Sequence, residues 1–435
     1  MAGMGALTRR TLTTSLMVAA LAGCTDGSGS APGSGSDAGG ASDSTAAPAA
    51  GGAAPDPAAK LATATRQADQ FDYDAALDTV DGVDGKDAED LRTRCHEEKD
   101  ALVPWPEDEP VSHLFFHSLI VDPSRAFDGD DTELGYDDYM CTIPEFTAVI
   151  ERMHEDGYVL ISPHDLAEPA EDGTMRPREL LLPEGRTPLV LSQDDVSYYE
   201  YMDGDGFAAD LHLDADGAVR SRYVDADGTE HEGAYDMVPL LDDYLAANPG
   251  FSYRGRKGII ALTGYNGILG YRSSPREYGE DPDALSAARD AAAEVAGALT
   301  DSGWEIASHT WGHIDMGEKP LEKVDADLQR WDEEVGTLVG DTDLLIYPFG
   351  ADIAGPEQYE EGDVRYRRLR DHGFSYFFTV DGSTLAWQQR HGEYLRQARM
   401  NIDGIRLRAT AAGEEHVLDP VLDAGAILDP ARPGL

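Results

Sequence analysis

The sequence predicts an α/β protein, a distorted (β/α) barrel of parallel strands with a β-hairpin insertion. Short apolar runs alternate with helical patterns from residue 111 to about residue 407. So many strand and helix units in one domain favour a closed or nearly closed barrel. Polar residues follow directly on several of the apolar runs, where the active sites of such barrels lie.

The first units show the alternation clearly. "SHLFFHSLIV" predicts a buried strand, and "TIPEFTAVIERMHE" predicts a helix. Thr142 and Glu145 have the spacing of a capping box at the start of this helix. Its apolar stripe consists of Phe146, Val149, Ile150 and Met153. Gly157 ends the helix, and "YVLIS" is the next predicted strand.

The alternation continues towards the C-terminus. The further predicted strands are "TPLVLS", "KGIIALTG", "WEIAS", "LLIYPFG" and "FSYFFTV". An Ala-rich helix is expected over about 283–302, and a second helix carries Val324, Leu328, Trp331, Val335 and Leu338 on one face.

An insertion at about 198–235 interrupts the pattern. Its "DADGAV" and "DADGTE" runs predict Asp-Gly hairpin turns. A calcium loop is the alternative, but the ordered acids and the terminal Glu of an EF-hand loop are missing.

The N-terminal segment 1–23 resembles a bacterial lipoprotein signal peptide. Arg9 and Arg10 precede a short apolar run that ends in Leu-Ala-Gly and Cys24. Cleavage would leave Cys24 as the lipidated first residue, and the run is too short to cross a bilayer as a helix. The twin arginines also resemble a Tat signal. We therefore expect an exported protein held on the outer face of the cell membrane by its lipid alone.

Three further segments follow the signal. Residues 24–59 are rich in Gly, Ser, Ala and Pro and predict a disordered tether. Residues 60–110 form an acidic helical lead-in of unknown role, and 111–435 form the barrel domain with its site. Cys95 and Cys141 would meet an oxidising exterior, but their spacing leaves open whether they form a disulfide.

The charge is strongly acidic, with 83 Asp and Glu against 34 Lys and Arg, a formal net charge of −49. Such a surface repels nucleic-acid phosphates and anionic lipids, so neither is expected as a partner.

Charged and aromatic side chains end three of the predicted strands. Asp194 and Asp195 follow "LVLSQ", His309 and His313 follow "WEIAS", and Tyr347, Pro348 and Phe349 end the strand "LLIYPFG". In a barrel of parallel strands these ends lie on one face. On a turn of helix, two histidines four residues apart can bind one cation, and two His with one carboxylate are a common ligand set for Zn²⁺ or another divalent ion.

A bound cation also explains the adjacent acids. One acid can bind the ion, whose charge lets the other stay ionised as a base. The motif differs from the H-E-x-x-H of metalloproteases, because Thr310 stands where their general-base Glu would be.

These motifs resemble those of the polysaccharide deacetylase family (the NodB-homology class, carbohydrate esterase family 4). "LSQDDV" resembles the family's Thr-Phe-Asp-Asp-Gly motif, "HTWGH" its His-Ser/Thr-x-x-His motif and "IYPFG" its third motif. "FFHS" resembles the Tyr-His-Ser of the family's first strand. The resemblance extends over about 111–407.

The resemblance implies a role for each matching residue. Asp194 would be the catalytic base, Asp195, His309 and His313 would bind a divalent metal with zinc as the first expectation, and Thr310 would brace the histidine loop. The backbone around Phe349 would stabilise the oxyanion, and Tyr347 and His117 would line the pocket. Arg399 matches no family motif, but it lies on a late predicted strand and is a further candidate for the pocket. The implied reaction is the removal of N-acetyl groups from an N-acetylglucosamine-type polysaccharide of the cell envelope or the extracellular space.

The chain also departs from the family pattern. Gln193 replaces the Phe before the paired acids, Ile346 stands where many members carry an Arg that orients the base, and no Leu-x-His motif supplies a general acid. Two other functions therefore stay open: a non-catalytic glycan-binding lipoprotein on the same barrel, and an esterase or amidase for a non-glycan substrate.

Overall fold

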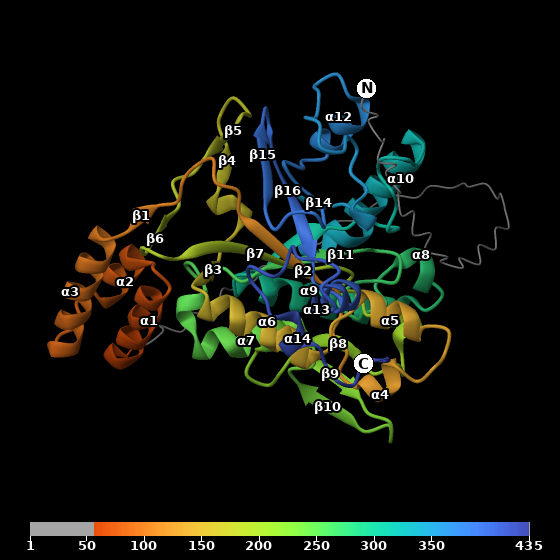
Figure 1. Cartoon of the computed structure of the whole chain (residues 1–435), viewed down its shortest axis with the longest axis horizontal. Helices are drawn as coiled ribbons and strands as arrows, with labels where there is room; N and C mark the ends of the chain where they lie inside the picture. The colour runs from red at the N-terminus through yellow and green to blue at the C-terminus, as the bar shows by residue number, and fades with distance from the viewer. Residues whose placement is uncertain (1–55, 435) are drawn as a thin grey trace, which may run out of the picture. The chain divides into compact units, whose positions relative to one another are not determined.

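Within residues 56–434, the part of the chain that the computed structural model describes, seven parallel strands close into a barrel (Figure 1). In order around the barrel they are β11 (Ile259–Leu262), β12 (Glu305–Ser308), β13 (Leu344–Ile346), β14 (Tyr376–Val380), β16 (Tyr394–Asn401), β2 (Ser112–Phe116) and β7 (Thr187–Gln193). Parallel pairing between the end of β7 and the start of β11 completes the circuit. The predicted distorted (β/α) barrel is confirmed.

The distortion is centred on β7. The first half of this strand pairs with β3 (Tyr158–Leu160), and its end pairs with β11. Outside this circuit, β15 (Trp387–His391) runs antiparallel to β16 as a hairpin.

The remaining elements surround the barrel (Figure 1). The helices are α1 (Pro57–Asp69), α2 (Tyr73–Val80), α3 (Lys86–Asp100), α4 (Pro123–Ala126), α5 (Glu133–Tyr139), α6 (Ile143–Glu155), α7 (Met237–Ala247), α8 (Pro275–Tyr278), α9 (Pro282–Asp301), α10 (Leu321–Trp331), α11 (Thr337–Val339), α12 (Val364–Asp371), α13 (Gly404–Ala411) and α14 (Ala424–Ile427). The short strands are β1 (Val103–Pro104), β4 (Ala167–Pro169), β5 (Met175–Pro177), β6 (Leu181–Leu182), β8 (Ala208–Leu213), β9 (Val219–Val224) and β10 (Glu230–Gly233).

Helix α6 forms as its sequence predicts. The Thr142 side chain accepts a hydrogen bond from the Glu145 amide, and the Glu145 side chain bonds back to the Thr142 amide. The predicted stripe is buried, and Phe146 packs edge-on against Phe116 of β2 at a centroid distance of 5.0 Å. Gly157 follows the helix with φ 84°, a conformation that glycine adopts without strain.

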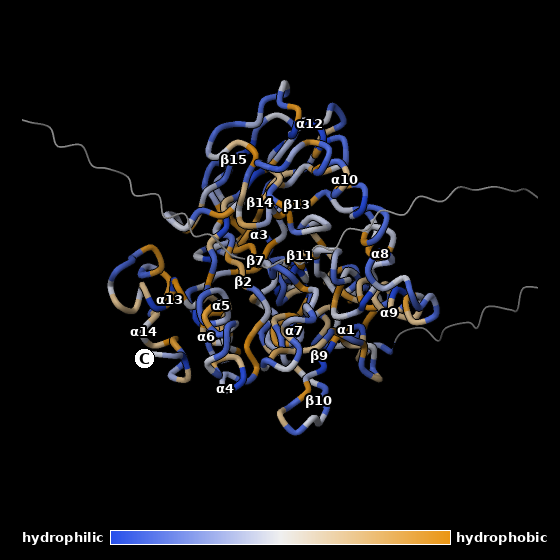
Figure 2. Tube along the Cα trace, turned by 90° about the vertical axis from the view of Figure 1, so that its right-hand side faces the viewer, coloured by the Kyte–Doolittle hydropathy of each residue, from blue (hydrophilic) through white to orange (hydrophobic). Residues whose placement is uncertain are grey.

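Alternate residues of the barrel strands belong to two apolar clusters. Leu191 and Ile260 pack with the surrounding helices, whereas Val190 and Ile259 belong to a second cluster inside the barrel. Figure 2 shows this apolar centre as orange segments in the central strands. The inner cluster also contains buried residues of α1, α2 and α3, so the helical lead-in extends the barrel core. It begins at Pro57, slightly earlier than expected.

The insertion forms an antiparallel sheet of β8, β9 and β10. In the first turn, the Asp214 carboxylate accepts hydrogen bonds from the amides of Asp216 and Ala218, each at 2.9 Å. Asp225 makes the matching bonds in the second turn. The Asp-Gly hairpin turns are therefore confirmed.

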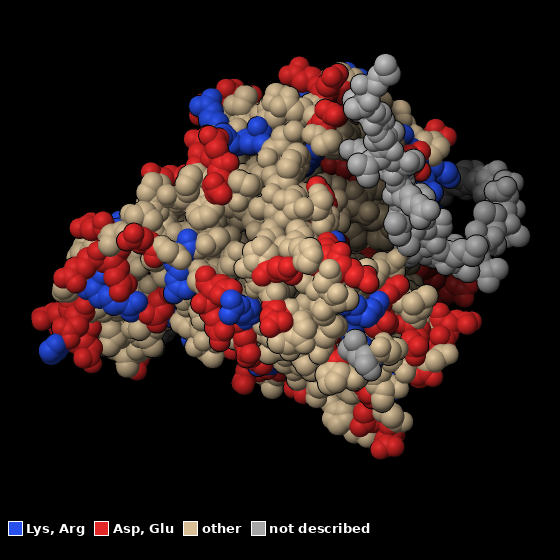
Figure 3. Space-filling model, in the orientation of Figure 1, with Lys and Arg blue, Asp and Glu red and all other residues tan. Residues whose placement is uncertain are grey.

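Cys95 and Cys141 are both free and buried, so no disulfide joins them. The Cys141 thiol donates to the Ile402 carbonyl at 3.2 Å. The predicted signal peptide, Cys24 and nearly all of the tether lie outside the described residues. Among residues 56–434, no helix combines the length and the apolar character needed to cross a membrane. Acidic side chains outnumber basic ones on the face drawn in Figure 3.

His164 joins elements near the start of β12 and β13. Its Nδ1 lies 2.6 Å from Glu305, and its Nε2 lies 3.0 Å from Asp343. Partial burial opposes protonation, but the bonds to Asp343 and Glu305 outweigh it and raise the pKa of His164 to about 10. The imidazole is therefore a cation held between two carboxylates at neutral pH.

We expect this ion cluster to lose its stabilising effect in alkali. Because the pKa is raised on folding, the contribution is complete below the unfolded pKa of about 6.5 and is lost as the pH rises through about 10. Urea unfolding at pH 6.5 and pH 10 should give a wild-type advantage over His164→Gln only at the lower pH. His416→Gln, at an exposed pair with Asp419, is the control, and an advantage of His164 that persists at pH 10 would contradict the assignment.

Candidate metal centre and active site

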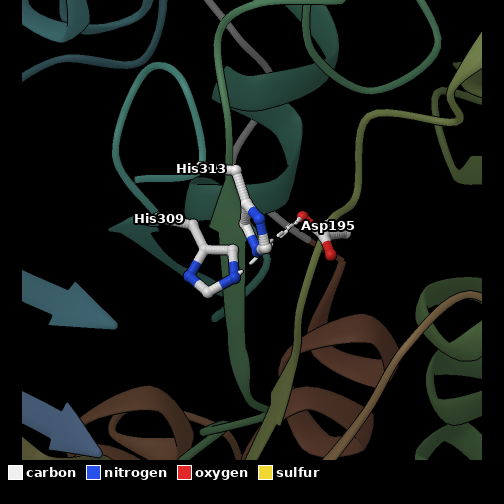
Figure 4. Close-up of side chains that lie close together, drawn as sticks. All are labelled: Asp195, His309 and His313. Carbon is white, nitrogen blue, oxygen red and sulfur yellow. Dashed lines mark ion pairs between the residues drawn. The ribbon is translucent and has the colours of Figure 1, made fainter. Parts of the chain in front are cut away.

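Three side chains meet above the carboxyl ends of β7 and β12. Asp195, His309 and His313 each offer one ligand atom, and these atoms lie within 4.8 Å of one another. The Asp195 Oδ1 atom lies 4.0 Å from His309 Nε2 and 3.9 Å from His313 Nε2. Figure 4 shows the three side chains pointing towards one another. The sequence motifs therefore converge on one cluster that can hold a cation.

The two histidines lie on a loop, so the expected helical turn is wrong. His309 directly follows β12, and the residues up to His313 form a turn. Thr310 has φ 61° and His313 has φ 48°, both in the left-handed region that a right-handed helix cannot use. The imidazoles meet because the chain bends back, rather than by the i, i+4 spacing of a helix.

The histidine loop is fixed by hydrogen bonds. Thr310 Oγ1 accepts from the Ile314 amide at 2.9 Å. Asp327, on α10, accepts from the amides of Trp311 and Gly312, each at 2.8 Å. Burial raises the pKa of Asp327 to about 6, although these amides oppose the shift. Sequence reasoning missed Asp327, and its only signal is an acid between Val324 and Leu328 on a buried helix face.

The donor set fits a divalent cation. His309 Nδ1 lies 2.9 Å from the Ile346 carbonyl and donates to it, which orients the ring so that Nε2 faces Asp195. Burial lowers the pKa of His313 to about 4, so this imidazole is neutral at physiological pH. Two imidazoles with one carboxylate suit zinc or a similar ion.

Asp194 is held by a buried arginine from another strand of the barrel. Arg399, on β16, donates from both terminal nitrogens to the two Asp194 oxygens at 2.7 and 2.9 Å. Burial would raise the pKa of Asp194, but Arg399 and then His309 hold it well below its usual range. The guanidinium lies 4.0 Å from the centre of the Phe115 ring. Asp194 is therefore an ionised and oriented carboxylate.

Gln193, which departs from the family motif, belongs to a polar network behind the site. Its amide donates to both oxygens of Asp236 at 2.9 Å. Asp236 is fully buried and also accepts from the Leu119 amide and the Tyr198 hydroxyl. The network joins the loops after β2 and β7 to the start of α7, and sequence reasoning did not find Asp236.

Two of the other expected pocket residues lie at the site. His117 directly follows β2, and its Nδ1 is buried without a hydrogen-bond partner. Phe349 is 56% exposed, and its ring lies edge-on to the His313 ring at a centroid distance of 4.4 Å.

The expectation for Tyr347 needs correction. Its ring is fully buried, its hydroxyl lies 3.0 Å from that of Tyr359, and it packs in an outer apolar cluster with Phe377. Tyr347 directly follows β13 and continues its alternation, in which neighbouring side chains point to opposite faces, so its ring points away from the pocket.

One segment of the chain matches a known protein family. Residues 284–360, which contain His309, His313 and Phe349, match the family model of the polysaccharide deacetylases. No curated protein matches. Among solved structures, the chain is similar to the Streptococcus pyogenes deacetylase PplD in complex with acetate, with 12% identity over 68% of this chain and 93% of that chain. The TM-score is 0.36.

The matched segment spans α9, β12, the histidine loop, α10 and β13. It thus holds both histidines of the candidate metal site and the loop that carries Phe349. For residues 284–360, the predicted resemblance to the polysaccharide deacetylase family is confirmed.

Proposed function

We propose that the protein is a zinc-dependent hydrolase that removes N-acetyl groups from an N-acetylglucosamine-type polysaccharide of the cell envelope or the extracellular space. One observation carries this proposal: the Asp195, His309 and His313 cluster adjoins Asp194, an acid kept ionised by Arg399. A deacetylase needs such a base beside its metal, and the family match to residues 284–360 supports the reaction class.

Asp195, His309 and His313 would hold the ion, which when bound would polarise the acetamide carbonyl and acidify a water molecule. Asp194 would accept the proton of the attacking water. Arg399 bonds both Asp194 oxygens, so it keeps the carboxylate ionised and fixes its direction. The arginine that many family members carry at the position of Ile346 is thus replaced in function by one from another strand.

His117 is our candidate for the general acid. The chain has no Leu-x-His motif, and the histidine that follows β2 has an unpartnered buried Nδ1. It lies close enough to Asp194 and Asp195 to help lower the pKa of both carboxylates. An imidazole there would donate its proton to the leaving amine as acetate separates.

A neutral glycan fits the surroundings of the site. Phe349 and Tyr201 are among the exposed large apolar side chains, at 56% and 58%, and both lie in segments that follow barrel strands. Aromatic rings offer flat apolar faces to sugar rings. The net charge of −49 disfavours anionic polymers and attracts the amine product.

We also propose export and lipid attachment at Cys24. The support is the sequence alone: an apolar run behind Arg9 and Arg10 that ends in Leu-Ala-Gly-Cys. The tether of 24–59 would then hold the barrel away from the membrane.

The purified chain is expected to release acetate from N-acetylglucosamine oligomers. A chelator should abolish the release and added Zn²⁺ should restore it. Asp195→Ala should lower activity by more than about 100-fold, beyond what the loss of an outer-shell partner costs. Acetate is measured by a coupled enzymatic assay, and zinc content by metal analysis.

Acetylated sugar esters are the control substrates for esterase activity. Chitin, poly-N-acetylglucosamine and peptidoglycan fragments are the glycans to be compared. Release from the esters alone would favour an esterase. A zinc-loaded protein that binds these glycans and releases nothing would favour the glycan-binding alternative and overturn the proposal.

A further inference from the structure

Tyr199 contacts the ligand face of Asp195. It lies in the loop after β7 and is buried, and its hydroxyl donates to Asp195 Oδ1 at 2.6 Å. The same Oδ1 atom is the one that faces the Nε2 atoms of His309 and His313. The hydrogen bond therefore acts on the oxygen that would bind the cation.

The Asp195 carboxylate sets the direction of this hydrogen bond, and two further hydroxyls are arranged to match it. An ionised carboxylate only accepts, so the single Tyr199 proton points to Asp195. Thr263 Oγ1 lies 2.8 Å from the Tyr199 oxygen and can donate to it. Ser197 Oγ lies 3.0 Å from Thr263 Oγ1 and can donate in turn. Each hydroxyl thus donates towards Asp195, and none competes for the carboxylate.

The Tyr199 ring cannot move away easily. It is stacked against the rings of Tyr201 and Tyr265. The ring-centroid distances are 5.5 Å and 5.1 Å, and the planes differ by 14° in both pairs. The Tyr199 ring also packs with Phe207 and Tyr136 in a small apolar cluster that the start of the insertion helps to form. A fixed donor on a rigid ring holds its acceptor in one orientation.

Asp195 needs such support because its backbone is unusual. Its φ is 61°, in the left-handed region that non-glycine residues seldom use. About a fifth of its side chain is exposed. Without a partner, the carboxylate could turn its oxygen away from the two imidazoles.

We propose that Tyr199 is a positioning residue that orients Asp195 for cation binding, and so couples the insertion to the metal site. The inference rests on the proposed function only in assuming that the cluster binds a cation. A side chain that hydrogen-bonds to a metal ligand typically raises the metal affinity by about 10- to 100-fold.

The test is the affinity of the full chain for Zn²⁺, measured by competition with a chromophoric chelator. Tyr199→Phe removes one oxygen and keeps the ring stack, and it should weaken Zn²⁺ binding by about 10- to 100-fold. At saturating Zn²⁺, kcat should stay within a few-fold of wild type, because Tyr199 positions a ligand and does not touch the reacting atoms. Tyr201→Phe is the matched control, since among residues 56–434 its hydroxyl makes no side-chain hydrogen bond.

Each outcome decides the matter. Unchanged Zn²⁺ affinity in Tyr199→Phe, equal losses in both variants, or a wild-type chain that binds no Zn²⁺ would overturn the inference. A chain that binds Zn²⁺ and is weakened by Tyr199→Phe alone, but never releases acetate, would support the role of Tyr199 and overturn the proposed deacetylase function.

Discussion

Asp194→Asn is expected to lower kcat for deacetylation by about 10²- to 10⁴-fold, the range that a positioned general base contributes. The amide keeps the size of the side chain and can still accept from Arg399, but it cannot take a proton from water. Asp195 and the two histidines are untouched, so Zn²⁺ affinity should stay close to wild type. Acetate release and chelator competition on the same preparation measure the two quantities.

The pH profile of the wild-type protein adds a second criterion. Arg399 and His309 outweigh burial and keep the pKa of Asp194 well below its usual range, so this base stays ionised far into acid. An acid limb of kcat/KM should therefore not arise from Asp194. Activity of Asp194→Asn within tenfold of wild type would remove Asp194 from the mechanism.

Local sequence signals predicted the helices and strands whose formation depends mainly on residues close together in the chain. The α6 helix follows from the Thr142 cap and a stripe at helical spacing, and both are local. The barrel followed from repetition, since alternating strands and helices can form only a parallel sheet with covered faces. The paired acids and paired histidines could be brought together because strand ends share one face.

Long-range partners could not be predicted in the same way. Arg399 is separated by 205 residues from the carboxylate that it bonds, and no local pattern distinguishes it from a surface arginine. The histidine spacing suggested a helix because i, i+4 periodicity is the usual way to align two side chains, whereas positive φ at Thr310 and His313 achieves the same alignment in a loop. Tyr199 and Asp236 act through tertiary contacts that only the folded chain creates.

A comparable long-range contact ties the C-terminal segment to the barrel. The Arg432 Nε atom lies 2.6 Å from Glu145, and one terminal nitrogen lies 2.8 Å from Asp137. Side-chain exposure is 0% for Arg432 and Glu145, so neither charge can be solvated by water. Glu145 also caps α6 through Thr142, so the same carboxylate stabilises the helix start and binds the C-terminal segment.

Arg432→Ala is expected to lower the free energy of unfolding by about 3–5 kcal/mol, because it leaves Glu145 buried without its cation. Asp137 keeps its ion pair with Arg408. Arg432→Lys keeps the charge but cannot bond both carboxylates, so its loss should be smaller. Urea unfolding measures both variants. The control is Arg152→Ala, which breaks a half-exposed pair with Asp156 on the surface of α6 and should cost no more than about 0.5 kcal/mol. A loss for Arg432→Ala as small as that of the control would mean that water reaches this network and that the C-terminal segment is not bound as the buried contacts imply.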